Sequence, residues 1–226
     1  MKFFKIFLLV LAIVLSSLRP RSYETSGTGM ISGRQITLSY RGSVTSSEGT
    51  RLIGVVVYID TTIGVRYDVV YIDTTNMTNA ISNTNYRIYY KFSNPDQTVF
   101  YNLNTHKSEV IKAKGSTDPG QEVDVVGTEN VSSYSCTHLQ HRWGSHEVSD
   151  YWMSPNIPGF SKLVNALKKI NPGMPALAFN VFNWGGLVKW TVYYVNRSRT
   201  LNLELHLSNA NTKANLPATT WDVPTK

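Results

Sequence analysis

Leucine occupies every second position from Leu201 to Leu207, and polar side chains fill the positions between them. The same alternation of apolar and polar residues runs through 36–40, 86–92 and 188–194. Because successive side chains of a strand point to opposite faces, strict alternation is typical of a sheet with one face on a core and one in water. The chain is therefore predicted to consist mainly of antiparallel strands.

A seven-residue string, VVYIDTT, occurs twice, ending at Thr62 and at Thr75. The offset between the copies fits one strand plus one turn, which predicts two successive strands of a meander rather than a solenoid. Asp60 and Asp73 precede the threonine pairs and could form an acid pair or a metal site. Aspartate before threonine is equally ordinary chemistry for the end of a strand, and this is the simpler interpretation.

The stretch 125–160 contains the only cysteine, Cys136, and three of the five histidines. Its pattern predicts that one strand closes at 125–127, that a hairpin follows with strands at 134–142 and 146–153, and that a helix then begins. Apolar residues at helical spacing place that helix at 160–170, and Asn-Pro-Gly stops it. With roughly ten strands spaced about a dozen residues apart, the fold class is β-rich α+β.

Four strings in this half of the chain occur in a recognisable order: VVGTENVSSYSCTHLQ, DYWMSPNIPGF, GMPAL and LPATTWDVPTK. Over about residues 95–226 the chain resembles an uncharacterised family of secreted Gram-negative proteins, a domain of unknown function grouped with the LolA-like lipoprotein carriers. The resemblance implies a curved antiparallel sheet, an open or incomplete barrel, with a short helix packed on its concave side. It implies no catalytic residues.

The first 17 residues read as a signal peptide, because two lysines precede an apolar run that is too short to cross a membrane. Residues 18–33 are a flexible lead-in, and 34–226 form a single β-rich domain. We therefore expect a periplasmic or secreted protein without a transmembrane span in its mature form. No cysteine follows the apolar run, so a lipobox is absent. An uncleaved N-terminal anchor is the alternative.

Several classes of function find no support in the sequence. The formal net charge is +7, but the basic residues are scattered rather than gathered in a stripe, so nucleic-acid binding is not expected. Phosphate loops, dinucleotide fingerprints and G-x-S-x-G motifs are all missing, so we expect neither a cofactor nor an enzyme. Glu147 and Asp150 could be the paired carboxylates of a glycosidase, but they read more simply as surface charge.

Cys136 and His138 share one face of the predicted strand 134–142, and His146 could reach them across the hairpin. Alternation sends His141 to the other face, which leaves too few ligands for a structural zinc site. No metal is therefore predicted, although the sequence leaves open whether His138 and His146 bind one. Cys136 is expected to be a buried, free thiol.

Two hypotheses about function survive. The first is a non-catalytic exported protein that binds a lipid or another apolar ligand in the cell envelope, because open barrels can enclose such ligands. The second is an envelope structural or protein-interaction module, with a filled core and a protein partner instead of a ligand. Seven side chains are the candidates for lining a cavity: Tyr90, Phe92, Trp152, Phe160, Leu163, Leu167 and Trp190.

Overall fold

The computed structural model describes residues 35–46, 49–72, 85–112, 123–143, 147–167, 169, 184–195 and 199–224. The predicted signal peptide and lead-in lie outside these residues. The described elements are β1 (Gln35–Ser46), β2 (Gly49–Asp60), β3 (Gly64–Ile72), β4 (Tyr86–Lys91), β5 (Gln97–Asn102), β6 (Lys107–Lys112), β7 (Asp124–Val131), β8 (Tyr134–Trp143), β9 (Glu147–Ser154), α2 (Phe160–Leu167), β10 (Gly186–Val195), β11 (Arg199–Asn211) and the 3-10 helix η2 (Ala218–Trp221).

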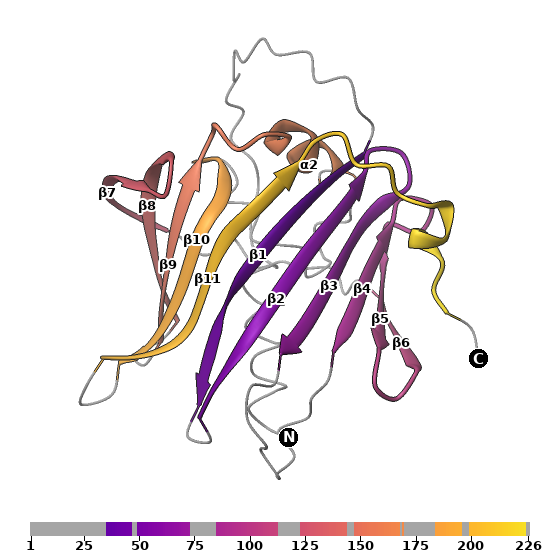
Figure 1. Cartoon of the computed structure of the whole chain (residues 1–226), viewed down its shortest axis with the longest axis horizontal. Helices are drawn as coiled ribbons and strands as arrows, with labels where there is room; N and C mark the ends of the chain where they lie inside the picture. The colour runs from indigo at the N-terminus through magenta and orange to yellow at the C-terminus, as the bar shows by residue number, and fades with distance from the viewer. Residues whose placement is uncertain are drawn as a thin grey trace.

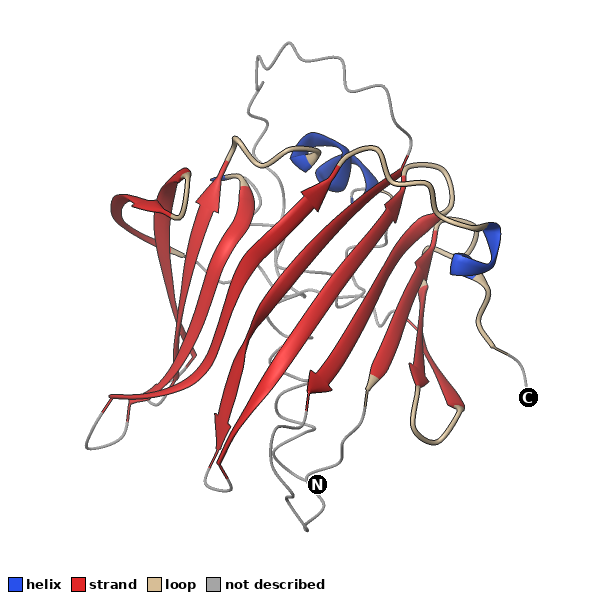
Figure 2. Cartoon of the chain, in the orientation of Figure 1, coloured by secondary structure: helices blue, strands red, loops and turns tan. Residues whose placement is uncertain are grey.

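The strands form one eleven-stranded sheet in the order β6-β5-β4-β3-β2-β1-β11-β10-β9-β8-β7. Every neighbouring pair is antiparallel. The sheet is curved and open, with β6 and β7 at its two edges (Figure 1). The short helix α2 lies at one end of the strands (Figure 2). The predicted fold class, a β-rich α+β domain built on a curved, incomplete barrel, is confirmed.

The first copy of VVYIDTT begins within β2 and the second within β3, and these two strands are antiparallel neighbours. The predicted meander is therefore confirmed. Asp60 ends β2 as expected: its Oδ1 accepts hydrogen bonds from the backbone N–H of Thr62 at 2.9 Å and of Ile63 at 3.2 Å. These are the turn hydrogen bonds expected of an aspartate at the end of a strand. Asp73 lies outside the described residues.

The boundaries differ from the sequence-based prediction at two points. The segment 125–127 opens a strand instead of closing one, because β7 continues to Val131 and turns tightly into β8 with Ser132 at φ 55°. The helix is described as ending at Leu167 rather than Ile170, and Ile170 lies outside the described residues.

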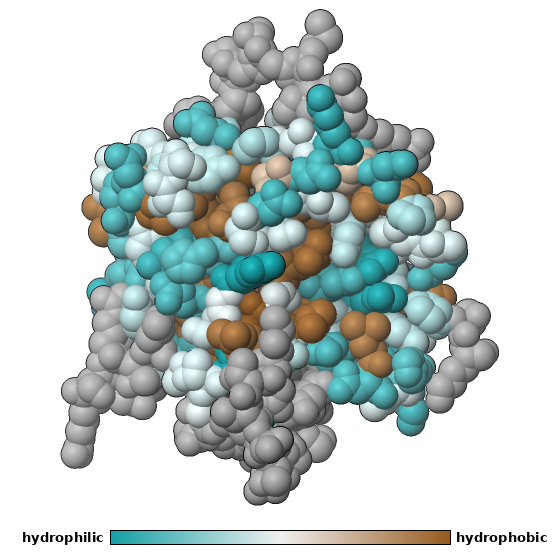
Figure 3. Space-filling view, viewed as in Figure 1, coloured by the Kyte–Doolittle hydropathy of each residue, from teal (hydrophilic) through white to brown (hydrophobic). Residues whose placement is uncertain are grey.

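We call the face of the sheet that meets α2 the inner face, and the opposite face the outer face. Ile36 belongs to the inner face, because it contacts Gly159 immediately before α2. The pairing of the strands shows which residues share this face. On one side of β1, Ile36 pairs with Ile59 of β2, which pairs with Val65 of β3. On the other side, Gly42 of β1 pairs with Leu205 of β11. The inner face is apolar, whereas polar side chains predominate on the outer face, which is turned to the viewer in Figure 3. Buried apolar residues of the inner face include Ile36, Leu38, Tyr40, Ile59, Val57, Val65, Tyr67, Ile88, Tyr90, Val188, Trp190, Val192, Leu203 and Leu205.

Two glycines let neighbouring strands approach more closely than any side chain would permit. A Cβ atom at Gly42 would overlap the backbone carbonyl oxygen of Glu204, and one at Gly64 would overlap that of Tyr90. Both glycines lie in strands of the curved sheet, where close approach of a second backbone is a recurrent reason for glycine. By contrast, a Cβ at Gly54 would meet only the carbonyl oxygen of Val70, at 3.9 Å.

Gly42→Ala is therefore expected to destabilise the protein by about 1–3 kcal/mol or more, because the new methyl group forces β1 and β11 apart. The matched control, Gly54→Ala, has room for its methyl group and should be neutral or stabilising by about 0.4–1 kcal/mol. Urea unfolding of both variants measures the difference. Equal midpoints for the two variants would contradict the close approach of β1 and β11 at Gly42.

Leu163 of α2 is 2% exposed and Asn165 is exposed. An eight-residue helix is too short to be stable alone, so its packing on the sheet must hold it. Leu163→Ala should lower the free energy of unfolding by about 2–5 kcal/mol. Asn165→Ala should change it by less than about 0.5 kcal/mol. Chemical denaturation distinguishes the two, and a neutral Leu163→Ala would show that α2 does not pack on the sheet.

Candidate ligand-binding face

The structure separates the seven candidate lining residues. Tyr90, Leu163 and Trp190 are buried on the inner side, and Phe92 and Phe160 pack partly buried against the same core. The backbone of Leu167 ends α2, but its side chain lies outside the described residues. Trp152 does not join this group.

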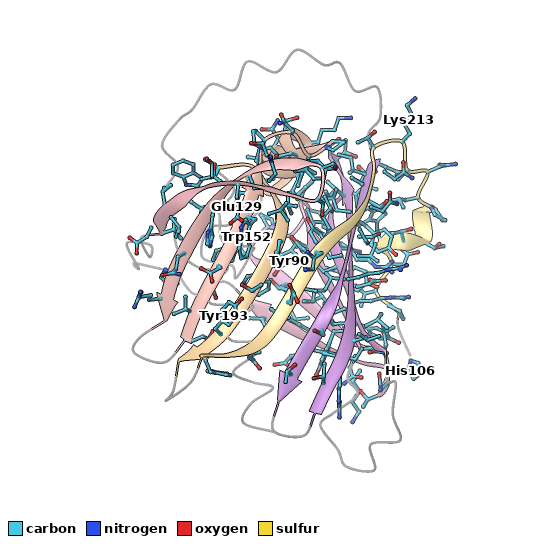
Figure 4. All side chains as sticks on the ribbon, turned by 60° about the vertical axis from the view of Figure 1, so that its left-hand side comes forward. Tyr90, His106, Glu129, Trp152, Tyr193 and Lys213 are labelled. Carbon is cyan, nitrogen blue, oxygen red and sulfur yellow. The ribbon has the colours of Figure 1, made fainter. Side chains whose placement is uncertain are left out.

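Trp152 lies on the outer face of β9. It pairs with Lys189 of β10, whereas the neighbouring Tyr151 pairs with Trp190 of the inner face. A strand sends successive side chains to opposite faces, so Trp152 and Trp190 cannot line one cavity. The Nε1 of Trp152 donates to Glu129, and Figure 4 shows these two residues side by side.

The inner face also carries aromatic partners that the sequence could not pair. Trp190 stacks on Tyr151 with ring centroids 5.9 Å apart and an interplanar angle of 12°. Tyr90 meets Tyr67 edge to face, at 5.9 Å and 87°. Tyr67 and Tyr151 are conspicuous in the sequence only as two of thirteen tyrosines. Their partners depend on the register between strands, which the sequence does not give.

Some polar atoms on this apolar face have no hydrogen-bond partner among the described residues. They include the Nε1 of Trp190, the hydroxyl of Tyr67 and the Oε1 of Glu147. Buried polar groups are nearly always hydrogen-bonded in folded proteins. Each of these atoms is therefore available to a water molecule or to a bound ligand.

Polarity rises along β9 with distance from α2. Ser154 pairs with Gly186, which lies against Ile157 just before α2, so this end of β9 is the helix end. The inner-facing residues then run Met153, Tyr151, Ser149 and Glu147, from apolar to acidic. The inner face is therefore apolar near α2 and carries a carboxyl group at the opposite end.

The sequence analysis treated Glu147 and Asp150 as surface charge, and the structure shows that this is wrong. Glu147 is 8% exposed and Asp150 is 2% exposed, because β9 lies between β8 and β10 and is buried along its whole length. The two side chains also occupy opposite faces, so they are not a carboxylate pair facing one substrate. Burial raises the pKa of Glu147 above the usual value for a glutamate.

On the outer face, His138 is held by carboxylates. Its ring stacks on Trp152 with centroids 4.4 Å apart, its Nε2 lies 3.2 Å from Asp150 Oδ1, and its Nδ1 lies 3.5 Å from Glu129 Oε1. Lys189 Nζ covers the Trp152 ring at 4.8 Å. These side chains satisfy one another, which leaves no exposed aromatic platform here.

The described residues contain no group of three histidine, cysteine or acidic side chains arranged to hold a metal ion. His146 lies outside those residues. Cys136 is buried and free, as predicted, and its thiol donates to the backbone carbonyl of Tyr134 at 3.5 Å. Burial raises the pKa of the Cys136 thiol, which disfavours the reactive thiolate.

The C-terminal segment lies against part of the outer face on the other half of the sheet. Arg66 forms an ion pair with Asp68 and donates to the carbonyl oxygen of Thr220 at 2.6 Å. The backbone N–H of Leu216 donates to Gln35 Oε1 at 2.6 Å, and Trp221 is buried. The inner face is lined mainly by apolar side chains and is the candidate for a binding surface.

Fold and inner face together define an open antiparallel half-barrel with an apolar lining. Residues 66–226 match the family profile of a domain of unknown function, DUF4412, and the chain belongs to that family. The predicted resemblance to an uncharacterised family, a domain of unknown function, is confirmed. A comparison with curated proteins found no match.

Solved structures with a similar overall arrangement share little sequence with this chain. An uncharacterised conserved protein from Thermus thermophilus is 7% identical, with 84% of this chain and 85% of that chain covered and a TM-score of 0.48. A putative outer membrane lipoprotein-sorting protein domain from Vibrio parahaemolyticus is 11% identical, with 84% and 89% covered and a TM-score of 0.36. A LolA superfamily protein from Nitrosomonas europaea is 9% identical, with 95% and 96% covered and a TM-score of 0.30.

Within the described part of the chain, no helix has the length and apolar character needed to cross a membrane.

Glu147→Gln tests the burial of the inner-face carboxyl. Because its pKa is raised, the folded protein binds this proton more tightly than the unfolded chain does. The carboxyl therefore lowers stability progressively as pH rises above the ordinary glutamate pKa of about 4.3, until the folded group has ionised. The stability advantage of Glu147→Gln over the wild type should accordingly be larger at about pH 8 than at about pH 4.

Urea unfolding at both pH values measures that advantage. Glu109→Gln, a change in the exposed strand β6, is the matched control and should show no such trend. An advantage for Glu147→Gln that stays constant with pH would mean that Glu147 ionises normally in the folded protein.

Proposed function

We propose that this protein is a non-catalytic, exported binding protein that holds a lipid or another apolar ligand against the inner face of its half-barrel, within the cell envelope. One observation carries the proposal. The inner face is apolar across most of the open sheet, yet among the described elements only the eight-residue helix α2 packs against it. An apolar surface of this size, against which so little of the described chain packs, is suited to an apolar ligand.

The aromatic pairs on this face support the proposal. Tyr67–Tyr90 and Tyr151–Trp190 give the lining rigid apolar rings. The unpartnered Tyr67 hydroxyl and Trp190 Nε1 add hydrogen-bond donors. Ligand sites of this kind are mostly hydrophobic, with a few polar groups that fix orientation. Tyr90, Phe92, Phe160, Leu163 and Trp190 remain our proposed lining residues, and Trp152 is removed from the set.

The alternative is an envelope structural or protein-interaction module whose inner face is simply its core. Near-complete burial of side chains such as Ile36, Leu38 and Leu203 favours it, because a filled core leaves no room for a ligand. The two functions differ in one measurable respect: only the first predicts that an apolar probe reaches the inner face.

Fluorescence quenching separates the two functions. A spin-labelled stearic acid bound on the inner face should quench Trp190, which is 4% exposed there. Trp190→Phe should therefore remove most of the quenching, because the nearby fluorophore is gone. Trp152→Phe, its outer-face counterpart, should leave the quenching intact. If the probe fails to quench the wild type, or quenches both variants equally, the inner face is not the binding surface.

A further inference from the structure

We propose that the ligand carries an ammonium group, and that Glu147 with Tyr151 and Tyr194 binds this group at the end of the inner face remote from α2. This inference rests on the proposed function and specifies the chemical class of the ligand: an amphiphile with an apolar chain and a cationic headgroup. The acid lies at the polar end of β9, and the apolar chain would extend from there towards α2.

The position of Glu147 is the first argument. Its side chain is more than nine-tenths buried, and its Oε1 has no hydrogen-bond partner among the described residues. None of the ion pairs formed within those residues includes it. Removing a carboxylate from water without a counter-charge is unfavourable. A cation supplied by the ligand would compensate that charge.

The surroundings of Glu147 are the second argument. Tyr194 stands directly opposite it on β10, and Tyr151 follows two positions beyond Ser149 along the same face of β9. Burial raises the pKa of both phenols, and Glu147 is near enough to each that its charge raises that pKa further. Tyrosine rings attract cations through their π faces, and rings combined with a carboxylate suit an alkylammonium group.

The other groups on this part of the inner face do not supply a counter-charge. Ser149 lies between Glu147 and Tyr151 and is neutral, and Val192 lies beside Tyr194. His141 of β8 pairs with Ser149 and is the one titratable side chain among the inner-facing positions of that strand. Above the ordinary histidine pKa of about 6.5 an imidazole is neutral, so binding is best measured at about pH 8.

Three probes with alkyl chains of nearly equal length and different headgroups test the inference: dodecylamine, dodecyltrimethylammonium and dodecanoate. Calorimetric titration at about 0.15 M salt screens attraction to distant charges. The whole chain carries a net charge of +7, so non-specific attraction favours dodecanoate. We expect the opposite order, with both cations binding at least about tenfold more tightly than dodecanoate, which corresponds to about 1.4 kcal/mol.

Glu147→Gln should abolish this preference while leaving dodecanoate binding equal or stronger. Tyr194→Leu keeps the acid and removes a ring, so it should weaken the trimethylammonium probe more than the primary amine, which can also donate hydrogen bonds to the carboxylate. Glu109→Gln on exposed β6 should change nothing.

The outcomes separate the inference from the function on which it rests. If all three probes bind equally, or if Glu147→Gln keeps the preference for cations, the ammonium site is refuted while apolar binding stands. If no probe binds, the proposed function fails together with the inference. Binding of dodecanoate alone would assign the headgroup site to an anion and overturn the inference directly.

Discussion

One-sided burial is the constraint on which this structure depends. Eleven strands share a single continuous ladder, so the backbone groups of the central strands are satisfied within the sheet. The apolar inner face must still be buried. Because the sheet is curved, the side chains of this face converge and pack against one another. Gly42 and Gly64 permit that curvature, because any side chain there would collide with the backbone of the neighbouring strand. The helix α2 then needs to cover only one end.

The outer face is organised by charge instead. Arg66 joins Asp68 to the carbonyl of Thr220, and thereby fixes the C-terminal segment against β3. His138 is held between Glu129 and Asp150 and against Trp152. Such pairs are satisfied internally, so they stabilise the arrangement of strands rather than offering free chemistry to a substrate. The inner face differs from the outer face because apolar side chains line most of its length.

The inner-facing side chains of β9 change from apolar near α2 to acidic at the opposite end, and this change connects the fold to the proposed chemistry. A strand in the interior of a sheet can carry an acid only where its side chain meets a partner, a water molecule or a ligand. Glu147 occupies such a place at the end of the apolar lining, opposite Tyr194. An amphiphile offers complementary features, with a chain for the apolar end and a headgroup for the acid.

Local patterns in the sequence are enough to predict most of the strands and to show which face of each strand is apolar. Apolar and polar residues alternate at 201–207 and 188–194, and this pattern can be recognised within each segment. Successive side chains of a strand point to opposite faces regardless of which strand it pairs with. The end of β2 at Asp60 and the start of α2 at Phe160 are equally local, since turn chemistry and helical spacing act within a few residues. The resemblance to a family of curved sheets supplied the rest of the fold class.

Only the tertiary structure decided how the strands combine. Trp152 and Trp190 both look like lining residues, and the register places them on opposite faces. Glu147 looks like surface charge, and the position of β9 between two other strands buries it. The physical reason is the same in both cases: period two fixes which side chains of a strand point together, but strand order and register decide what they meet, and those depend on contacts between residues far apart in the chain.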